Sequence, residues 1–96
     1  MGVDELLKGQ REQVLRIAAR HGARNVRVFG SVARGTAGPE SDLDLLVEVG
    51  PDHSPWFPGG LIADLEELLG RSVEVATESA LHWCIRDQVL KEAVPL

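Results

Sequence analysis

Apolar and polar positions along the chain follow two different periods, which predict a mixture of helices and strands. Between residues 3 and 20 apolar side chains recur at spacings of three and four, so one amphipathic helix is predicted there. Residues 61–69 show the same helical spacing. A last helix is predicted to begin at a Ser79 cap and to run to about residue 93, with a buried face made of Leu81, Ile85, Val89 and Leu90.

Three short segments between these helices have the character of strands. Apolar and polar residues alternate over residues 25–30, and residues 71–77 form another such run. Residues 42–49 contain the unbroken apolar run L-L-V, which indicates a strand buried on both faces. Residues 31–35 are expected to form one helical turn, and the glycine- and proline-rich segments 36–41 and 50–60 to be loops.

The predicted order of elements is αβ(α)βαβα. We therefore expect an α+β protein with a small mixed β-sheet of about three strands, flanked by helices. A length of 96 residues is typical of one domain, so residues 1–96 are expected to form a single domain.

Composition narrows the class of protein. Hydrophobic residues make up 44% of the chain and charged residues 26%, as in ordinary globular proteins, and no apolar run approaches the roughly 20 residues that a membrane-spanning helix needs. The net charge of −5 makes direct binding to nucleic acid unlikely on electrostatic grounds. A single cysteine, Cys84, excludes an internal disulfide and fits the cytoplasm.

The first candidate for chemistry is the turn after the first strand. Gly30 lets the backbone approach a ligand closely, and Ser31 adds a hydroxyl at the start of a helical turn whose free N–H groups would face an anion. Gly-Ser pairs also occur in many ordinary turns. Arg34, four residues after Gly30, is equally compatible with a phosphate contact and with a place on the surface.

The second candidate is a pair of aspartates. In a strand, residues two apart point to the same face, so Asp42 and Asp44 are expected to project together. Two neighbouring carboxylates repel each other, and Mg²⁺ prefers such hard oxygen ligands. A solvated strand end would also carry acidic residues. We favour a metal site, because the strand becomes strongly apolar immediately after Asp44.

A third carboxylate, Glu74, lies in the last predicted strand between Val73 and Val75. It could complete a metal site or accept a proton from an attacking hydroxyl. It could equally be a polar residue on the open face of an alternating strand. Spacing leaves these two interpretations open.

The chain resembles the nucleotidyltransferase superfamily that includes DNA polymerase beta, because it contains G-S-V-A-R-G followed by S-D-L-D-L-L-V. Within that superfamily it is most similar to the minimal nucleotidyltransferases. The resemblance implies the nucleotidyltransferase fold and transfer of AMP, or another nucleoside monophosphate, from ATP or another nucleoside triphosphate to a hydroxyl. It implies a phosphate-binding turn at Gly30 and Ser31, and Mg²⁺ held by Asp42 and Asp44. Glu74 stands where the family usually has an aspartate.

The resemblance also implies a partner. Minimal nucleotidyltransferases often act as antitoxins to a HEPN-domain ribonuclease, to which they add AMP.

Trp56 and Phe57 lie in a proline-rich loop, where they could anchor such an interface or cover the core. Trp83 and Cys84 are expected to pack inside. Two alternatives stay open: a module that neutralises its partner by contact alone, and a nucleotide-binding subunit that needs a separate acceptor-binding protein.

Overall fold

A computed structural model describes residues 1–51, 53 and 55–96 of the chain, so the predicted loop at residues 50–60 lies partly outside the described residues, at positions 52 and 54. The elements follow one another in this order: α1 (Val3–Leu6), α2 (Arg11–Arg20), β1 (Ala23–Phe29), α3 (Gly30–Arg34), β2 (Leu43–Val49), α4 (Gly59–Leu69), β3 (Val73–Thr77), the 3₁₀ turn η1 (Glu78–Ala80), α5 (Trp83–Glu92) and β4 (Val94–Pro95).

The strands form one mixed sheet in the order β3-β2-β1-β4. β1 runs antiparallel to β2 and to β4, whereas β2 and β3 are parallel. The α+β class and the mixed sheet are thus confirmed, but the expected number of about three strands is one too low. β4 has only two residues, and it forms because the C-terminal segment lies beside β1, where Val94 pairs with Val28. The local sequence pattern does not encode this long-range pairing.

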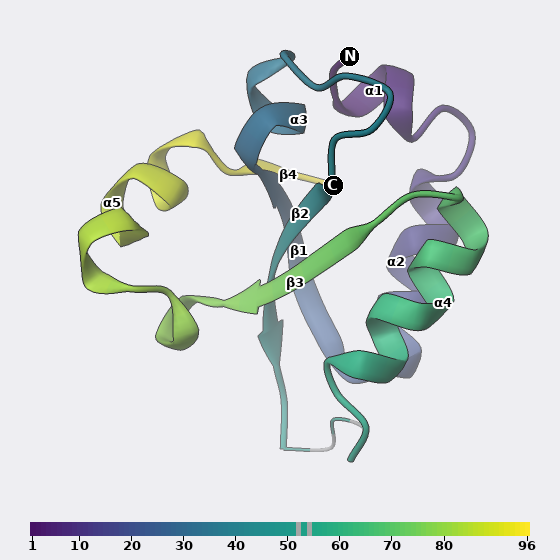
Figure 1. Ribbon diagram of the computed structural model, residues 1–96. Helices are drawn as coiled ribbons and strands as arrows, with labels where there is room; N and C mark the ends of the chain where they lie inside the picture. Colours follow the sequence, from purple (N-terminus) through teal and green to yellow (C-terminus); the bar gives the residue numbers. More distant parts are fainter. Residues whose placement is uncertain (52, 54) are drawn as a thin grey trace.

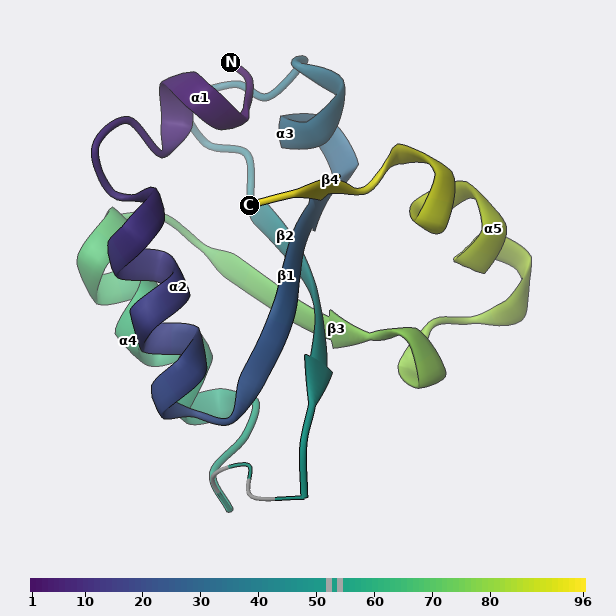
Figure 2. The same ribbon diagram turned by 180° about the vertical axis from the view of Figure 1, so that it is seen from behind.

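The two faces of the sheet are covered differently. In Figures 1 and 2, α2 and α4 lie side by side against one face, while α5 stands apart on the other side of the sheet. Leu43, Leu45 and Val47 of β2 are buried in the core with α2 and α4. Leu46 alternates to the opposite face and is also fully buried, which confirms that this strand is covered on both faces.

The single helix predicted over residues 3–20 is wrong, because the chain folds into α1 and α2 with a turn between them. Gly9 lies in that turn with φ +74°, a conformation that glycine adopts without strain, and glycine inside a helix costs about 1 kcal/mol relative to alanine. The break lets α1 fold back. The amino group of Met1 then donates a hydrogen bond to the Ala37 carbonyl at 2.9 Å, beside α3.

The last helix also differs from the prediction. It begins at Trp83, and its N-cap is His82, whose ring accepts a hydrogen bond from the Cys84 N–H at 3.3 Å; Ser79 instead shares a hydrogen bond with the Thr77 hydroxyl. Of the side chains of α5 predicted to be buried, only Val89 is. The physical reason is that an amphipathic spacing indicates which face is apolar but not whether another element is there to cover it.

Several large apolar side chains remain exposed as a result. Trp83 is 82% exposed and Ile85 46%, and Cys84 is exposed as well, so the expectation that Trp83 and Cys84 pack inside is wrong. In the proline-rich loop the two aromatics separate: Phe57 packs against the core, whereas Trp56 is 78% exposed. Within the described residues, no helix combines the length and the apolar character needed to cross a bilayer.

Candidate active site

The predicted phosphate turn and the predicted metal carboxylates meet because β1 and β2 are antiparallel. Phe29, the last residue of β1, pairs with Asp44 near the start of β2, so the next residue, Gly30, lies beside the Asp44 carboxylate. Gly30 has φ +76°, and a Cβ at this position would collide with Asp44 Oδ2. Only glycine satisfies both the backbone conformation and this close approach.

Asp44 and Glu74 are neighbours on the parallel strands β2 and β3, where they occupy paired positions. The pKa of Asp44 is raised to about 6, most of all by burial and then by the charge of Glu74 and a hydrogen bond that the protonated Asp44 donates to the Glu74 side chain. The charge of Asp42 adds to this effect, while Arg34 opposes it. The three carboxylates therefore form a negative cluster that Arg34 only partly offsets.

Asp42 is held differently from Asp44. β2 begins at Leu43, so Asp42 precedes the strand that was expected to start with it, and it is exposed. The loop before it is fixed by Arg71, whose Nη1 donates to the carbonyls of Ser41 at 2.8 Å and Gly38 at 3.3 Å. Sequence analysis missed Arg71, because nothing in the spacing links it to a loop so distant in the chain.

The donor set fits a hard cation that arrives with its ligand. Asp44, Glu74 and Asp42 supply carboxylate oxygens, but no three His, Cys, Asp or Glu side chains among the described residues are arranged to enclose a metal ion. Mg²⁺ commonly uses one or two carboxylates together with substrate phosphates and waters. The cluster is thus suited to an ion shared with a nucleotide rather than to a permanent structural ion.

The turn itself is the start of the five-residue helix α3. Its N-cap residue, Phe29, provides no side-chain cap, so the first N–H groups of the helix depend on other partners. Glu92, at the end of α5, accepts a hydrogen bond from the Gly30 N–H at 3.0 Å. The same carboxylate pairs with Arg34 Nη1 at 3.0 and 3.2 Å. Glu92 is a second residue that the sequence did not reveal.

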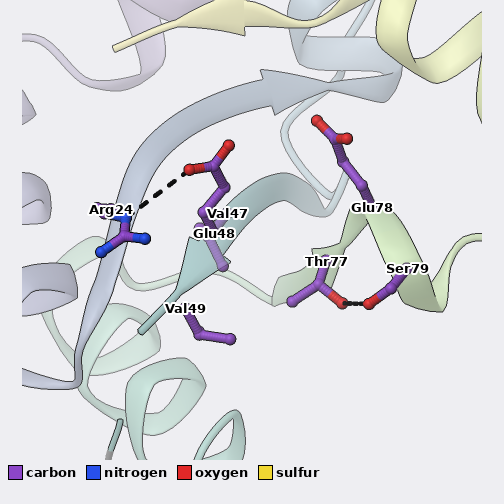
Figure 3. Close-up of a pocket in the computed structure, with 7 residues that line it drawn as sticks. All are labelled: Arg24, Val47, Glu48, Val49, Thr77, Glu78 and Ser79. Atoms are coloured by element: carbon purple, nitrogen blue, oxygen red, sulfur yellow. Dashed lines mark hydrogen bonds and ion pairs between the residues drawn. The ribbon is translucent and has the colours of Figure 1, made fainter. Parts of the chain in front are cut away.

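The site is open to solvent, because Asp42 and Glu74 are exposed and Asp44 is only half-buried. A hollow of about 360 Å³, drawn in Figure 3, lies at the opposite ends of β2 and β3. Its edge is marked by the Arg24–Glu48 ion pair and by the hydrogen-bonded hydroxyls of Thr77 and Ser79. None of the residues predicted to bind phosphate or metal lines this hollow, so it does not correspond to the predicted site.

Comparison with known proteins agrees with this geometry. The model of the nucleotidyltransferase domain family matches residues 9–96. MJ0435 of Methanocaldococcus jannaschii, provisionally named a protein adenylyltransferase, is 35% identical over 94 residues, which cover 98% of this chain and 97% of that protein. The protein adenylyltransferase MntA of Thermococcus cleftensis is 40% identical over 75 residues, covering 78% of this chain and 76% of MntA.

Solved structures resemble the whole fold. A provisionally assigned minimal nucleotidyltransferase superposes with a TM-score of 0.84 at 49% identity, covering 100% of this chain and 97% of that one. A toxin–antitoxin complex with AMP-PNP contains a chain with the same fold, at a TM-score of 0.74 and 17% identity, with 88% and 69% of the two chains covered. By family model, sequence and fold, this chain belongs to the nucleotidyltransferase family of enzymes.

Proposed function

We propose that this protein transfers AMP from ATP to a hydroxyl group of a protein partner, in a reaction that depends on Mg²⁺. The observation that carries the proposal is the contact between the Gly30 turn and the carboxylate of Asp44, with Glu74 on the neighbouring strand. A turn suited to phosphates and a cluster of carboxylates suited to a divalent cation lie against each other, as phosphoryl and nucleotidyl transfer require.

In this proposal each residue has a defined task. The N–H groups at the start of α3, the Ser31 hydroxyl and the Arg34 guanidinium bind the β- and γ-phosphates. Asp42 and Asp44 would hold the metal ion, which when bound would neutralise phosphate charge, and Glu74 would either complete the metal site or act as the base. The acceptor oxygen bonds to the α-phosphorus, the bond from that phosphorus to the bridging oxygen breaks, and pyrophosphate leaves with the electron pair. In the role of base, the Glu74 carboxylate would accept the hydroxyl proton.

The proposed partner is a HEPN-domain ribonuclease, to which this chain would be the cytoplasmic antitoxin. Support comes from relatives named protein adenylyltransferases and from toxin–antitoxin complexes that contain the same fold. Exposed Trp56 and Trp83 are side chains of the kind that anchor protein interfaces. The acidic surface, with a net charge of −5, argues against a polynucleotide as the acceptor.

A second candidate function is neutralisation of the partner by contact alone. Two points favour it: residue 74 is a glutamate where the family resemblance implies an aspartate, and the carboxylates do not form a ready-made metal cage among the described residues. The first function requires catalysis and the second does not. Variants of the carboxylates therefore distinguish the two.

The direct test incubates the protein with ATP, Mg²⁺ and a HEPN-domain protein as the proposed partner, and then measures the intact mass of that partner. Adenylylation adds one or more AMP groups. Asp42→Asn and Asp44→Asn should each abolish the addition, whereas Glu67→Gln, an exposed change on α4, should leave it intact. Addition of AMP that survives both aspartate substitutions would refute the proposed metal site.

A further inference from the structure

The carboxylate of Glu92 connects the C-terminal helix to both ends of α3. It accepts a hydrogen bond from the N–H of Gly30, the first residue of α3, at 3.0 Å. It also pairs with the guanidinium of Arg34, the last residue of α3, at 3.0 Å. One side chain from the far end of the sequence thus contacts both the first backbone N–H of the phosphate-binding turn and the guanidinium of Arg34.

α3 needs such support because it is short. A helix of five residues cannot hold its own shape in water, since isolated helices shorter than about 12 residues are only marginally stable. No side chain caps α3 locally. A carboxylate near the first turn stabilises a helix both as an acceptor for a free N–H group and through the helix dipole. Glu92 is in a position to supply both effects.

The environment of Glu92 makes this contact strong and specific. Its side chain is only 18% exposed, whereas that of Arg34 is 50% exposed. Charge-assisted hydrogen bonds are roughly twice as strong as neutral ones, and they strengthen further when water is excluded. The hydrogen bonds to Glu92 use only Nη1 of Arg34, so Nη2 and Nε of the guanidinium keep their donors for a ligand.

We propose that Glu92 is a positioning residue that fixes the phosphate-binding turn and the Arg34 guanidinium in the geometry required to bind the triphosphate. This inference rests on the proposed function for the identity of the ligand. The role follows from the positions of the two contacts. Loss of the Glu92 carboxylate would free both the backbone at Gly30 and the side chain of Arg34. Because α5 carries Glu92, displacement of this helix would loosen the nucleotide site.

The test uses the full chain with Glu92→Ala and Glu92→Gln, and with Glu67→Ala as a matched control on the exposed side of α4. In Glu92→Ala, the Kd for ATP in the presence of Mg²⁺ should rise by about tenfold or more, because a misplaced binding group loses much of its effect. Glu92→Gln should show a smaller rise, since its amide oxygen still accepts from the Gly30 N–H. The control should bind as the wild type does.

Two further readouts separate positioning from a general loss of structure. Exchange of the Gly30 amide hydrogen, followed by NMR, should accelerate in Glu92→Ala while amides of the β2 core keep their protection. In a double-mutant cycle, Arg34→Ala should remove only the part of the Glu92→Ala effect on ATP affinity that acts through Arg34, and the part that acts through the Gly30 N–H should remain.

The outcomes distinguish this inference from the proposed function. Unchanged Gly30 exchange in Glu92→Ala overturns the positioning role whether or not nucleotide binds. Tighter ATP binding by Glu92→Ala also overturns it, since the carboxylate would then be a competitor for the phosphate position. If the wild type binds ATP and Mg²⁺ but modifies no partner, the proposed function fails. The effects of the Glu92 variants on ATP affinity and on Gly30 amide exchange then still decide the role of Glu92.

Discussion

The backbone of Gly30 lies directly against the carboxylate of Asp44, so close that any side chain at position 30 would collide with Asp44 Oδ2. The two residues belong to different elements, and the antiparallel pairing of β1 with β2 brings them together. This contact joins the place proposed for phosphate to the place proposed for the metal.

Gly30→Ala should therefore damage both stability and binding. The left-handed backbone conformation alone costs an L-residue about 1–2 kcal/mol, and the collision with Asp44 adds to this cost. We expect a lower free energy of unfolding in urea and loss of measurable ATP binding. Gly59→Ala is the matched control: it lies in open space at the start of α4 and should leave both quantities close to wild type. Full ATP affinity in Gly30→Ala would contradict the assigned turn.

Asp44→Asn should stabilise the protein without ligand while abolishing transfer. The pKa of Asp44 is raised from 3.8 to about 6, first by burial and then by Glu74, so ionising Asp44 is less favourable in the folded than in the unfolded chain. The wild type consequently loses stability as the pH rises between these two values, and the loss persists above pH 6. Unfolding in urea from pH 4.5 to 8 should show that wild type and Asn variant diverge in this window, with the variant more stable at neutral pH.

Metal affinity should fall as the pH falls through about 6. A proton on Asp44 competes with the cation, so affinity should drop by up to about tenfold for each pH unit below the raised pKa. Titration with Mn²⁺ in place of Mg²⁺, followed by paramagnetic broadening in NMR spectra, measures this between pH 5 and 8. Asp44→Asn should bind weakly at every pH. An affinity that is independent of pH in the wild type would remove Asp44 from the metal site.

Variants of Glu74 distinguish catalytic transfer of AMP from neutralisation of the partner by contact alone. Glu74→Asp introduces the aspartate that the family resemblance implies at this position and should keep transfer within about tenfold of wild type, whereas Glu74→Ala should lower kcat by about a hundredfold or more if Glu74 takes the proton. Both variants should fold, because Glu74 is exposed. Growth rescue from the partner's toxicity provides the second readout: rescue by Glu74→Ala without any transfer would favour contact alone.

Arg71→Gln tests whether the loop before Asp42 must be held. Losing the bonds from Arg71 to the carbonyls of Ser41 and Gly38 should let Asp42 move, with a fall in kcat of about tenfold and little change in the KM for the acceptor. Arg16→Gln, a change at a largely exposed position on α2, serves as the control. Equal kcat in Arg71→Gln and wild type would show that the position of Asp42 does not depend on this contact.

The local sequence pattern predicted the parts of the site that lie close together in the chain. Gly30, Asp42 and Asp44 were singled out as candidates because a turn followed by paired carboxylates has a recognisable order and spacing. The core of β2 was also predictable, since an unbroken apolar run indicates a strand covered on both faces. The left-handed conformation at Gly30 was also expected for a glycine in this turn, whereas its contact with Asp44 was not predicted and comes from the pairing of β1 with β2.

Contacts between distant segments were not predictable. Glu92 reaches the site from the last helix and Arg71 from the turn before β3. A charged residue in such a place has the same local pattern whether or not it has a distant partner. The same limit applies to β4, which exists only because the chain end returns to β1. It also applies to α5, whose apolar residues Ile85 and Leu90 lack a covering surface in the described chain.

The most direct test of the central claim is the fate of two labels in ATP. The protein is incubated with Mg²⁺, the proposed partner and ATP labelled either at the α-phosphate or at the γ-phosphate. If the chain transfers AMP through the Gly30 and Asp44 site, the partner should gain label from the α-phosphate alone, and Asp44→Asn should prevent it. Transfer of the γ-phosphate label, or α-label transferred equally by Asp44→Asn, would contradict the account.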